Sequence, residues 1–240
     1  MSGSITLENR FGVNKMELIS LKYAIFVIVL LVLYYCFPKK YRWYVLLAGS
    51  MAYYVIICKW YVLFIIFTIC TTYGSTIWID KLLKKQNAIV KSHKEDWDRQ
   101  TRKEYKEKGR KKRVAVMLFA LLCNFGILAF LKYIPYAGEL GLLLPLGISF
   151  YTFQSMGYVM DVYREIVEPE KNFLKVALFV SFFPQIIQGP IAIYDKLAGQ
   201  LYEGHSLRLE NLQKGALLVL WGVMKKLVIA DRAVNIINFV

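Results

Sequence analysis

Polar side chains that could bind a substrate occur inside an apolar stretch that ends near residue 164. They recur at helical spacing and supply two phenols, an amide and a carboxylate: Tyr151, Gln154, Tyr158 and Asp161. On a helix of 3.6 residues per turn these positions lie on one face. Such a face either hydrogen-bonds to neighbouring helices, with Asp161 near the aqueous end and paired with Arg164, or lines a polar tunnel. The residues themselves leave both alternatives open.

A second group of polar residues lies in the segment 181–191, SFFPQIIQGPI. Gln185 and Gln188 are three residues apart and would share a helix face, but Pro184 and the Gly189-Pro190 pair disrupt the helix on both sides. Broken backbone at membrane depth is tolerated only where it is buried in protein or lines a cavity. We therefore expect the two amides to lie in a substrate tunnel, where they could bond to an acyl carbonyl or a carrier group.

No residue of this chain is assigned as catalytic. The histidines, His93 and His205, lie in polar segments and are interpreted as surface residues. Nucleophile elbows, glycine-rich phosphate loops and metal-ligand spacings are not found. We expect no bound cofactor and no metal site. The four cysteines are interpreted as buried or lipid-facing thiols, and they are Cys36, Cys58, Cys70 and Cys123.

The composition and the arrangement of apolar residues indicate a membrane protein. Of the 240 residues, 57% are hydrophobic and 20% charged, and the mean hydropathy is +0.42. A run of about 18 apolar residues crosses the ~30 Å hydrocarbon layer as a helix. These runs lack the alternation of barrel strands. They cover approximately residues 18–37, 43–57, 60–79, 114–131, 140–163, 173–193 and 215–240.

From these runs we predict an all-α integral membrane protein. The predicted fold is a multi-pass helical bundle with about six to seven hydrophobic segments, one of which is broken or re-entrant. We expect residues 1–240 to form a single membrane domain. A re-entrant hairpin at Pro184 would place residues 195–214 in the cytoplasm, and a full crossing would place them outside. The sequence leaves that topology open.

Positive charge is concentrated between the third and fourth apolar runs. Fourteen lysines and arginines lie between Lys81 and Arg113, against five acidic residues, and the chain carries a net charge of +14. By the positive-inside tendency, residues 80–113 form a basic cytoplasmic loop of a cell-membrane protein. The basic turn 39–42 would face the same side. Residues 108–113 adjoin the fourth run and could bind anionic lipid headgroups of the bilayer. We expect no nucleic acid as a partner.

Three motifs resemble those of the membrane-bound O-acyltransferase family. The first is PLGISFYTFQSMGYVMDVYR at 145–164, the second is FFPQ at 182–185 followed by QGP at 188–190, and the third is WGVMKKLVIADR at 221–232. They are most similar to the bacterial branch that holds the alginate O-acetylation proteins and the D-alanyl transfer protein of teichoic acid synthesis. Their order fits the N-terminal half of that family.

The resemblance implies a bundle of helices that encloses a tunnel. It also implies a reaction in which an acyl group, expected to be acetyl, moves from a cytoplasmic thioester donor to a hydroxyl of an extracytoplasmic polymer. It implies a catalytic histidine later in the fold than residues 1–240, so we expect this chain alone to be inactive. Gln154, Asp161, Gln185 and Gln188 correspond to tunnel or scaffold positions, and Tyr158 joins them as a tunnel candidate.

The implied partners are a C-terminal half or downstream membrane subunit, and acyl-carrier or extracytoplasmic acetylation proteins. Two other interpretations stay open. One is a non-enzymatic membrane subunit that keeps the tunnel half of the fold and serves a partner. The other is a transporter-like pore.

Overall fold

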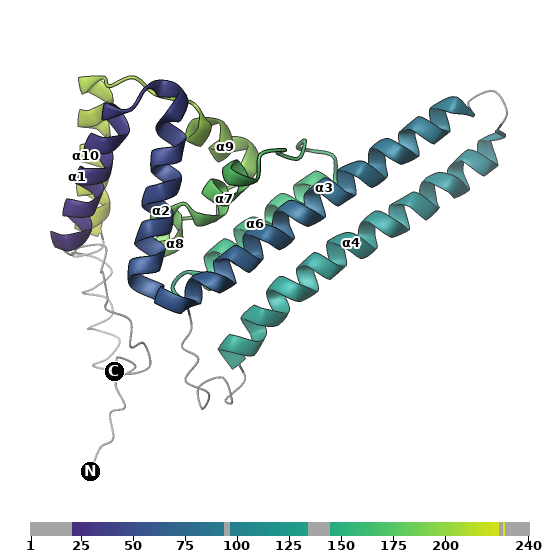
Figure 1. The fold of residues 1–240 in the computed structure, drawn as a ribbon, viewed down its shortest axis with the longest axis horizontal. Helices are drawn as coiled ribbons and strands as arrows, with labels where there is room; N and C mark the ends of the chain where they lie inside the picture. The colour runs from purple at the N-terminus through teal and green to yellow at the C-terminus, as the bar shows by residue number, and fades with distance from the viewer. Residues whose placement is uncertain (1–20, 94–96, 134–144, 226–227, 229–240) are drawn as a thin grey trace, which may run out of the picture. The chain divides into compact units, whose positions relative to one another are not determined.

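The described part of the chain is built from helices. The computed structural model describes residues 21–93, 97–133, 145–225 and 228, and the regular elements in these ranges are α-helices and short 3-10 turns. Figure 1 labels the helices. In chain order they are α1 (Leu21–Cys36), α2 (Arg42–Cys58), α3 (Val62–Ser92), α4 (Arg99–Tyr133), α6 (Ile148–Tyr163), α7 (Phe173–Ser181), α8 (Phe183–Gln188), α9 (Tyr194–Tyr202) and α10 (Leu209–Met224), with 3-10 turns at Lys39–Tyr41 and Lys59–Tyr61.

The helices follow the predicted apolar runs. The first two runs coincide with α1 and α2, and the third and fourth lie inside α3 and α4. Two helical stretches, Lys39–Ser92 and Arg99–Tyr133, are long and apolar enough to cross a membrane, and shorter apolar helices cover Leu21–Cys36 and Phe173–Ile187. The all-helical class and the apolar helices agree with the prediction, and the number of crossings stays a prediction. Residues 134–144 and half of the third motif lie outside the described residues.

The described residues divide into two compact units. One comprises residues 43–203, and the other comprises residues 21–42 together with 204–225. In the second unit, the basic turn is joined to the segment that precedes α10. The Arg42 guanidinium donates to the His205 carbonyl oxygen and lies over the Tyr34 ring, 5.3 Å from its centroid. The His205 amide donates to the Tyr34 hydroxyl at 3.3 Å.

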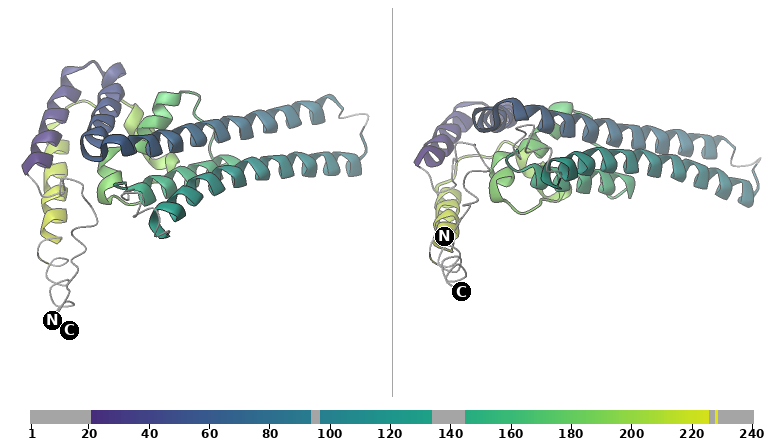
Figure 2. Two further views of the ribbon diagram at one scale, coloured as in Figure 1. Left: turned by 60° about the horizontal axis from the view of Figure 1, so that its bottom comes forward. Right: turned by 90° about the horizontal axis from the view of Figure 1, so that it is seen from below.

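In the first unit, α3 and α4 form a long antiparallel hairpin (Figures 1 and 2). Most of the segment 80–113, which the charge pattern predicts as a loop, is therefore helical. The apolar spans continue into charged helix on both sides, because lysine, arginine, glutamate and glutamine are good helix formers. The Gln86 amide nitrogen joins the two helices by donating to the Tyr105 and Lys106 carbonyls at 3.2 and 2.8 Å.

The inner face of α3 carries small hydroxylated residues that let its neighbours approach closely. Thr68, Thr72, Ser75 and Thr76 are buried. The hydroxyls of the last three bond to carbonyls one turn earlier in the same helix, at 2.6 to 3.0 Å. Such residues are common where membrane helices pack, since they satisfy their own polar groups and keep backbones close. The helix α3 packs against α4, α6 and α7.

The short helix α7 is the centre of this unit. Its residues from Val176 to Ser181 are all buried, as expected for a helix that is surrounded by others. Next to it, α6 begins at Gly147, which has a φ of +70°. A Cβ at this position would collide with the Ile186 carbonyl oxygen of α8. Only glycine adopts this backbone at little cost, so Gly147 permits α6 to start directly against α8.

Candidate functional site

The central feature of the site is a helix break between α7 and α8. In an unbroken helix the Phe183 amide would donate to the Phe179 carbonyl four residues earlier. The chain is extended at Phe182 instead, with φ −59° and ψ 107°, and Pro184 opens α8. Both freed groups find partners on other helices. The Gln154 amide nitrogen of α6 donates to the Phe179 oxygen at 2.7 Å, and the Phe183 amide donates to Ser50 Oγ of α2 at 3.4 Å.

Three further polar atoms on α6, α7 and α8 are buried and have no hydrogen-bond partner among the described residues. They are Ser155 Oγ on α6, Ser181 Oγ at the end of α7 and Gln185 Oε1 on α8. Ser155 and Ser181 are wholly buried. Buried polar groups are nearly always paired in proteins, so unpaired atoms on three helices that pack together require an explanation. A polar ligand with both a carbonyl and a hydroxyl would suit these atoms.

The predicted polar face of α6 is turned into the protein. Tyr151, Gln154 and Tyr158 are at most 3% exposed, and Asp161 is half-buried near the end of the helix. No ion pair among the described residues joins Asp161 to Arg164, which is exposed. The side chain of Gln188 lies outside what the structure describes, although its backbone ends α8. The structure thus brings Gln154 and Gln185 to the break, and the tunnel role of the five candidates stays a prediction.

Tyr158 belongs to an aromatic cluster beside the break. Its ring stacks on Tyr194 of α9, with centroids 4.1 Å apart, and Phe179 meets Tyr194 edge to face at 4.9 Å. The Tyr158 hydroxyl accepts a hydrogen bond from the Glu170 amide at 2.8 Å. Burial raises the pKa of Tyr194 above its usual value, so its phenol stays protonated near neutral pH. This cluster fixes α9 and the α6–α7 connection on the outside of α7.

Sequence reasoning missed the contribution of α2. Tyr54 is wholly buried, its ring lies 6.3 Å from that of Tyr151, and the two hydroxyls are neighbours of the Cys58 thiol. Ser50 lies one turn before Tyr54, and its hydroxyl meets the break. The signal available was the spacing of Ser50, Tyr54 and Cys58, which places three polar or sulfur-bearing side chains on one face of an otherwise apolar helix.

His93 does not lie at the break. His93 is half-buried at the tip of the α3–α4 hairpin, where its ring stacks on Trp97 at 4.8 Å and its Nδ1 lies 3.1 Å from the Ile89 oxygen. His205 lies in the other unit. Within the described ranges, no group of three or more His, Cys, Asp or Glu residues could hold a metal ion.

A separate cleft of about 300 Å³ lies between α3 and the α6–α7 connection. Its polar lining comes from Asp80, Lys84 and Asn87 on one side and from Glu165 and Glu168 on the other. Lys84 is paired with Asp80 at 2.6 Å. The cleft lies where the apolar part of α3 gives way to its charged part, and it does not include the polar atoms of the break.

Fold and site together define an all-helical protein with helices of membrane-spanning character and a polar, broken helix pair in its interior. Comparison with known proteins refines this class. The chain is 40% identical to a probable alginate O-acetylase of Pseudomonas syringae pv. tomato over 37% of the chain and 17% of that protein. It is 30% identical to a peptidoglycan O-acetyltransferase of Helicobacter pylori over 51% of the chain and 31% of that protein.

A probable alginate O-acetylase of Pseudomonas putida is 34% identical over 48% of the chain and 22% of its own length. The matched regions therefore span less than a third of these relatives. No family model matches the chain, and no solved structure matches it. The curated relatives confirm the resemblance predicted from the three motifs, namely to bacterial membrane-bound O-acyltransferases that acetylate polysaccharides.

Proposed function

We propose that this chain is the N-terminal part of a membrane-bound O-acyltransferase. It would help to move an acyl group, acetyl in the first instance, from a cytoplasmic thioester to a hydroxyl of an extracytoplasmic polysaccharide or cell-wall polymer. The names of the relatives support the reaction class. The basic charge of residues 80–113 supports a cell-membrane protein with that segment in the cytoplasm.

The chemistry sets requirements that this chain meets only in part. A hydroxyl oxygen attacks the thioester carbonyl carbon, a C–O bond forms, the C–S bond breaks, and the thiol leaves. A base must take the hydroxyl proton. His93 lies at the tip of the α3–α4 hairpin, and the family resemblance implies a histidine later in the fold, so we expect the base outside residues 1–240. This chain would supply binding and positioning, and we assign it no proton-transfer step.

The observation that carries the proposal is the helix break between α7 and α8, together with the buried, unpaired polar atoms on α6, α7 and α8. Ser155 and Ser181 hydroxyls can donate to an acyl carbonyl, and Gln185 Oε1 can accept from an acceptor hydroxyl. Gln154 would act as a positioning residue, because its amide holds the end of α7. Gln188, Tyr158 and Asp161 extend the proposed path along α8 and α6.

A non-enzymatic scaffold subunit is the alternative, and one observation favours it. Gln154 and Tyr158, two of the five candidates, use their polar groups in hydrogen bonds to Phe179 and Glu170 of the same unit. Such contacts are what a structural polar face would make. A scaffold would keep the fold and its partners without any transfer of its own.

The test is co-expression of this chain with the membrane subunit encoded next to it, followed by chemical analysis of acyl groups on the cell-surface polymer. We expect acylation only when both are present, and no transfer from a radiolabelled thioester by the isolated chain. Turnover by the isolated chain would refute the split assignment. Unchanged acylation after deletion of this chain would refute the proposed function.

A variant sharpens this test. Gln188→Leu in the reassembled enzyme should lower acyl transfer while membrane insertion stays intact. Gln100→Leu, at an exposed position on α4, is the matched control and should leave transfer unchanged. If the Gln188→Leu enzyme transfers acyl groups at the rate of the control, Gln188 is a packing residue and the scaffold interpretation is favoured.

A further inference from the structure

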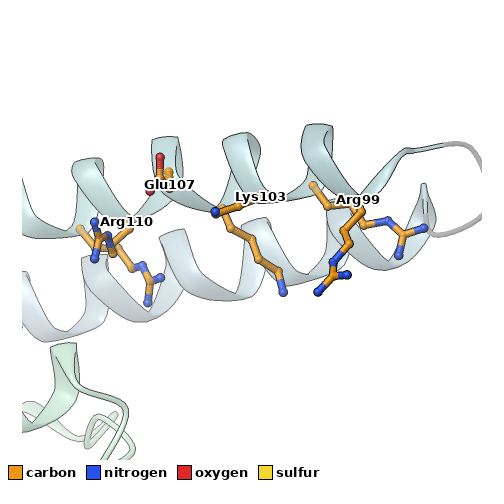
Figure 3. Close-up of a pocket in the computed structure, with 7 residues that line it drawn as sticks. Arg99, Lys103, Glu107 and Arg110 are labelled. Atoms are coloured by element: carbon orange, nitrogen blue, oxygen red, sulfur yellow. The ribbon is translucent and has the colours of Figure 1, made fainter.

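The charged half of α4 presents a row of cations along one side. The residues recur at i, i+4, i+7 and i+11 and are exposed: Arg99, Lys103, Lys106 and Arg110. We call this row the basic face. It lies in an open groove of about 540 Å³ whose other lining residues are Arg102, Glu107 and Arg113 (Figure 3). The row covers about 16 Å of helix at 1.5 Å per residue.

The hairpin that carries the basic face is fixed at both ends. At its base, Arg113 pairs with Glu165 at 2.8 Å and donates to Gln86 at 3.4 Å. At its tip, Trp97 stacks on His93 and meets Tyr105 edge to face at 5.1 Å. The face is therefore a preformed surface, and its cations need not be gathered by folding on binding.

The outer cations of the basic face lie too far from the bilayer to be bound by lipid headgroups. The apolar part of α4 begins at Val114, so a helix along the membrane normal carries Lys103 and Arg99 about 15 and 21 Å above Arg113. The headgroup layer is about 5 to 7 Å thick, and attraction to it falls off within the Debye length of about 8 Å. Lipid headgroups can hold Arg110 and reach Lys106, but they leave the outer half of the face without a partner.

We propose that the basic face binds a soluble protein through an acidic helix. A straight row of charges at helical spacing matches carboxylates at the same spacing on a second helix. The lining residues include no aromatic ring on which nucleotide bases could stack, which disfavours single-stranded nucleic acid. The inference requires that the apolar halves of α3 and α4 lie in lipid. It does not depend on acyl transfer.

The experiment uses the full chain in nanodiscs of neutral phosphatidylcholine. The probe is a synthetic helical peptide with glutamates at i, i+4, i+7 and i+11, and the control peptide has the same composition with its glutamates distributed around the helix. Fluorescence anisotropy measures affinity as salt increases. We expect the ordered peptide to bind about tenfold more tightly than the control peptide and to weaken with salt.

The chain offers matched variants. The triple variant Lys103→Gln, Lys106→Gln, Arg110→Gln removes three cations from the basic face. The triple variant Lys108→Gln, Lys111→Gln, Lys112→Gln removes three exposed cations from the opposite side of the same helix. Circular dichroism checks that both stay helical. The first should weaken peptide binding about tenfold and the second by about twofold or less. Equal losses, or equal binding of both peptides, would overturn the proposal.

A second measurement tests whether the basic face binds the membrane surface. A nitroxide at position 103, in a chain without its own cysteines and in nanodiscs that contain phosphatidylglycerol, reports collisions with a water-soluble nickel complex. We expect free access to the nickel complex. Protection that requires phosphatidylglycerol would show that the face lies on lipid, and the proposal of a protein partner would be wrong.

Discussion

Gln154 provides the Phe179 carbonyl with the hydrogen bond that the next turn of an unbroken helix would have made. The donor comes from α6, and the N···O distance is 2.7 Å. This contact explains how a helix can stop in the middle of an apolar segment. A carbonyl left unpaired there would cost roughly 1–3 kcal/mol, so the amide stabilises the break at the same time as it joins α6 to α7.

Loss of this amide should destabilise the protein. We expect Gln154→Leu to lower the free energy of unfolding by about 1–2 kcal/mol, because the Phe179 oxygen stays buried without a donor. Titration with a denaturing detergent, followed by circular dichroism, measures the change. Phe150→Leu alters an exposed side chain one turn earlier on α6 and should cost less than about 0.5 kcal/mol. Similar losses for the two variants would show that the hydrogen bond is not the cause.

Gly147 should not tolerate a side chain. Alanine there would need a left-handed backbone and would collide with the Ile186 carbonyl oxygen, so we expect Gly147→Ala to cost at least about 2 kcal/mol. Gly157→Ala in the same helix meets open space and is the control. The same unfolding measurement applies. A Gly147→Ala protein as stable as the control would contradict the packing of α6 on α8.

A side chain at Gly109 should lower stability because it displaces Gln86, and not because of the backbone conformation of Gly109. A Cβ at 109 would lie 2.5 Å from Gln86 Cδ and would displace an amide that bonds to Tyr105, Lys106 and Arg113. We expect Gly109→Ala to destabilise by about 1 kcal/mol, after allowing about 1 kcal/mol for the better helix propensity of alanine.

Two comparisons check the Gly109 prediction. Gly126→Ala, at a site with open space, should be neutral or slightly stabilising. Adding Gln86→Ala to Gly109→Ala should remove most of the steric cost, and thermal unfolding of the set measures both effects. A double variant less stable than Gln86→Ala alone would mean that another contact excludes the methyl group.

Removing either partner of the ion pair at the base of the hairpin should cost a different amount of stability. The Arg113 side chain is 11% exposed and that of Glu165 is 53% exposed. Glu165→Gln leaves a buried cation without its counter-charge, and we expect a loss of about 1–2 kcal/mol. Arg113→Met leaves a carboxylate that water can solvate, and should cost less. A double-mutant cycle by chemical unfolding measures the coupling, and the reverse order of losses would contradict this account.

Substitution of Gln185 should lower activity without lowering stability. Its Oε1 is buried without a partner among the described residues, so Gln185→Leu should leave stability unchanged or raise it by up to about 1 kcal/mol. In the reassembled enzyme the same change should reduce polymer acylation about tenfold, because an acceptor for the substrate hydroxyl is lost. A variant that is destabilised yet fully active would assign Gln185 to packing.

Local periodicity was sufficient to predict most of the helices. The runs at 18–37 and 43–57 became the helices Leu21–Cys36 and Arg42–Cys58, with nearly the predicted bounds. Pro184 correctly indicated a break, although the backbone leaves the helix at Phe182, two residues earlier. The basic segment 80–113 is largely helical, because its charge pattern marks where a membrane segment ends and not where the helix ends, and its place in the cytoplasm stays a prediction.

The polar face of α6 was also predictable, since Tyr151, Gln154 and Tyr158 are spaced for one buried side. What the sequence could not supply were the partners across helices. The Gln154–Phe179 contact joins residues 25 apart, and Ser50 meets Phe183 across 133 residues. Such pairs depend on how helices pack in three dimensions. Without an alignment of related sequences, periodicity within a single helix carries no information about them.

The continuity of α4 has a mechanical consequence. Its 35 residues form one continuous helix of about 52 Å without a proline, and a continuous helix transmits rotation along its length. A force applied near Arg99 would act as a torque on the opposite end, where Leu128 and Leu131 are buried. Tilting of the hairpin would thus shift α6, against which α4 packs, so a change at the charged tip can be transmitted to the apolar half of the unit.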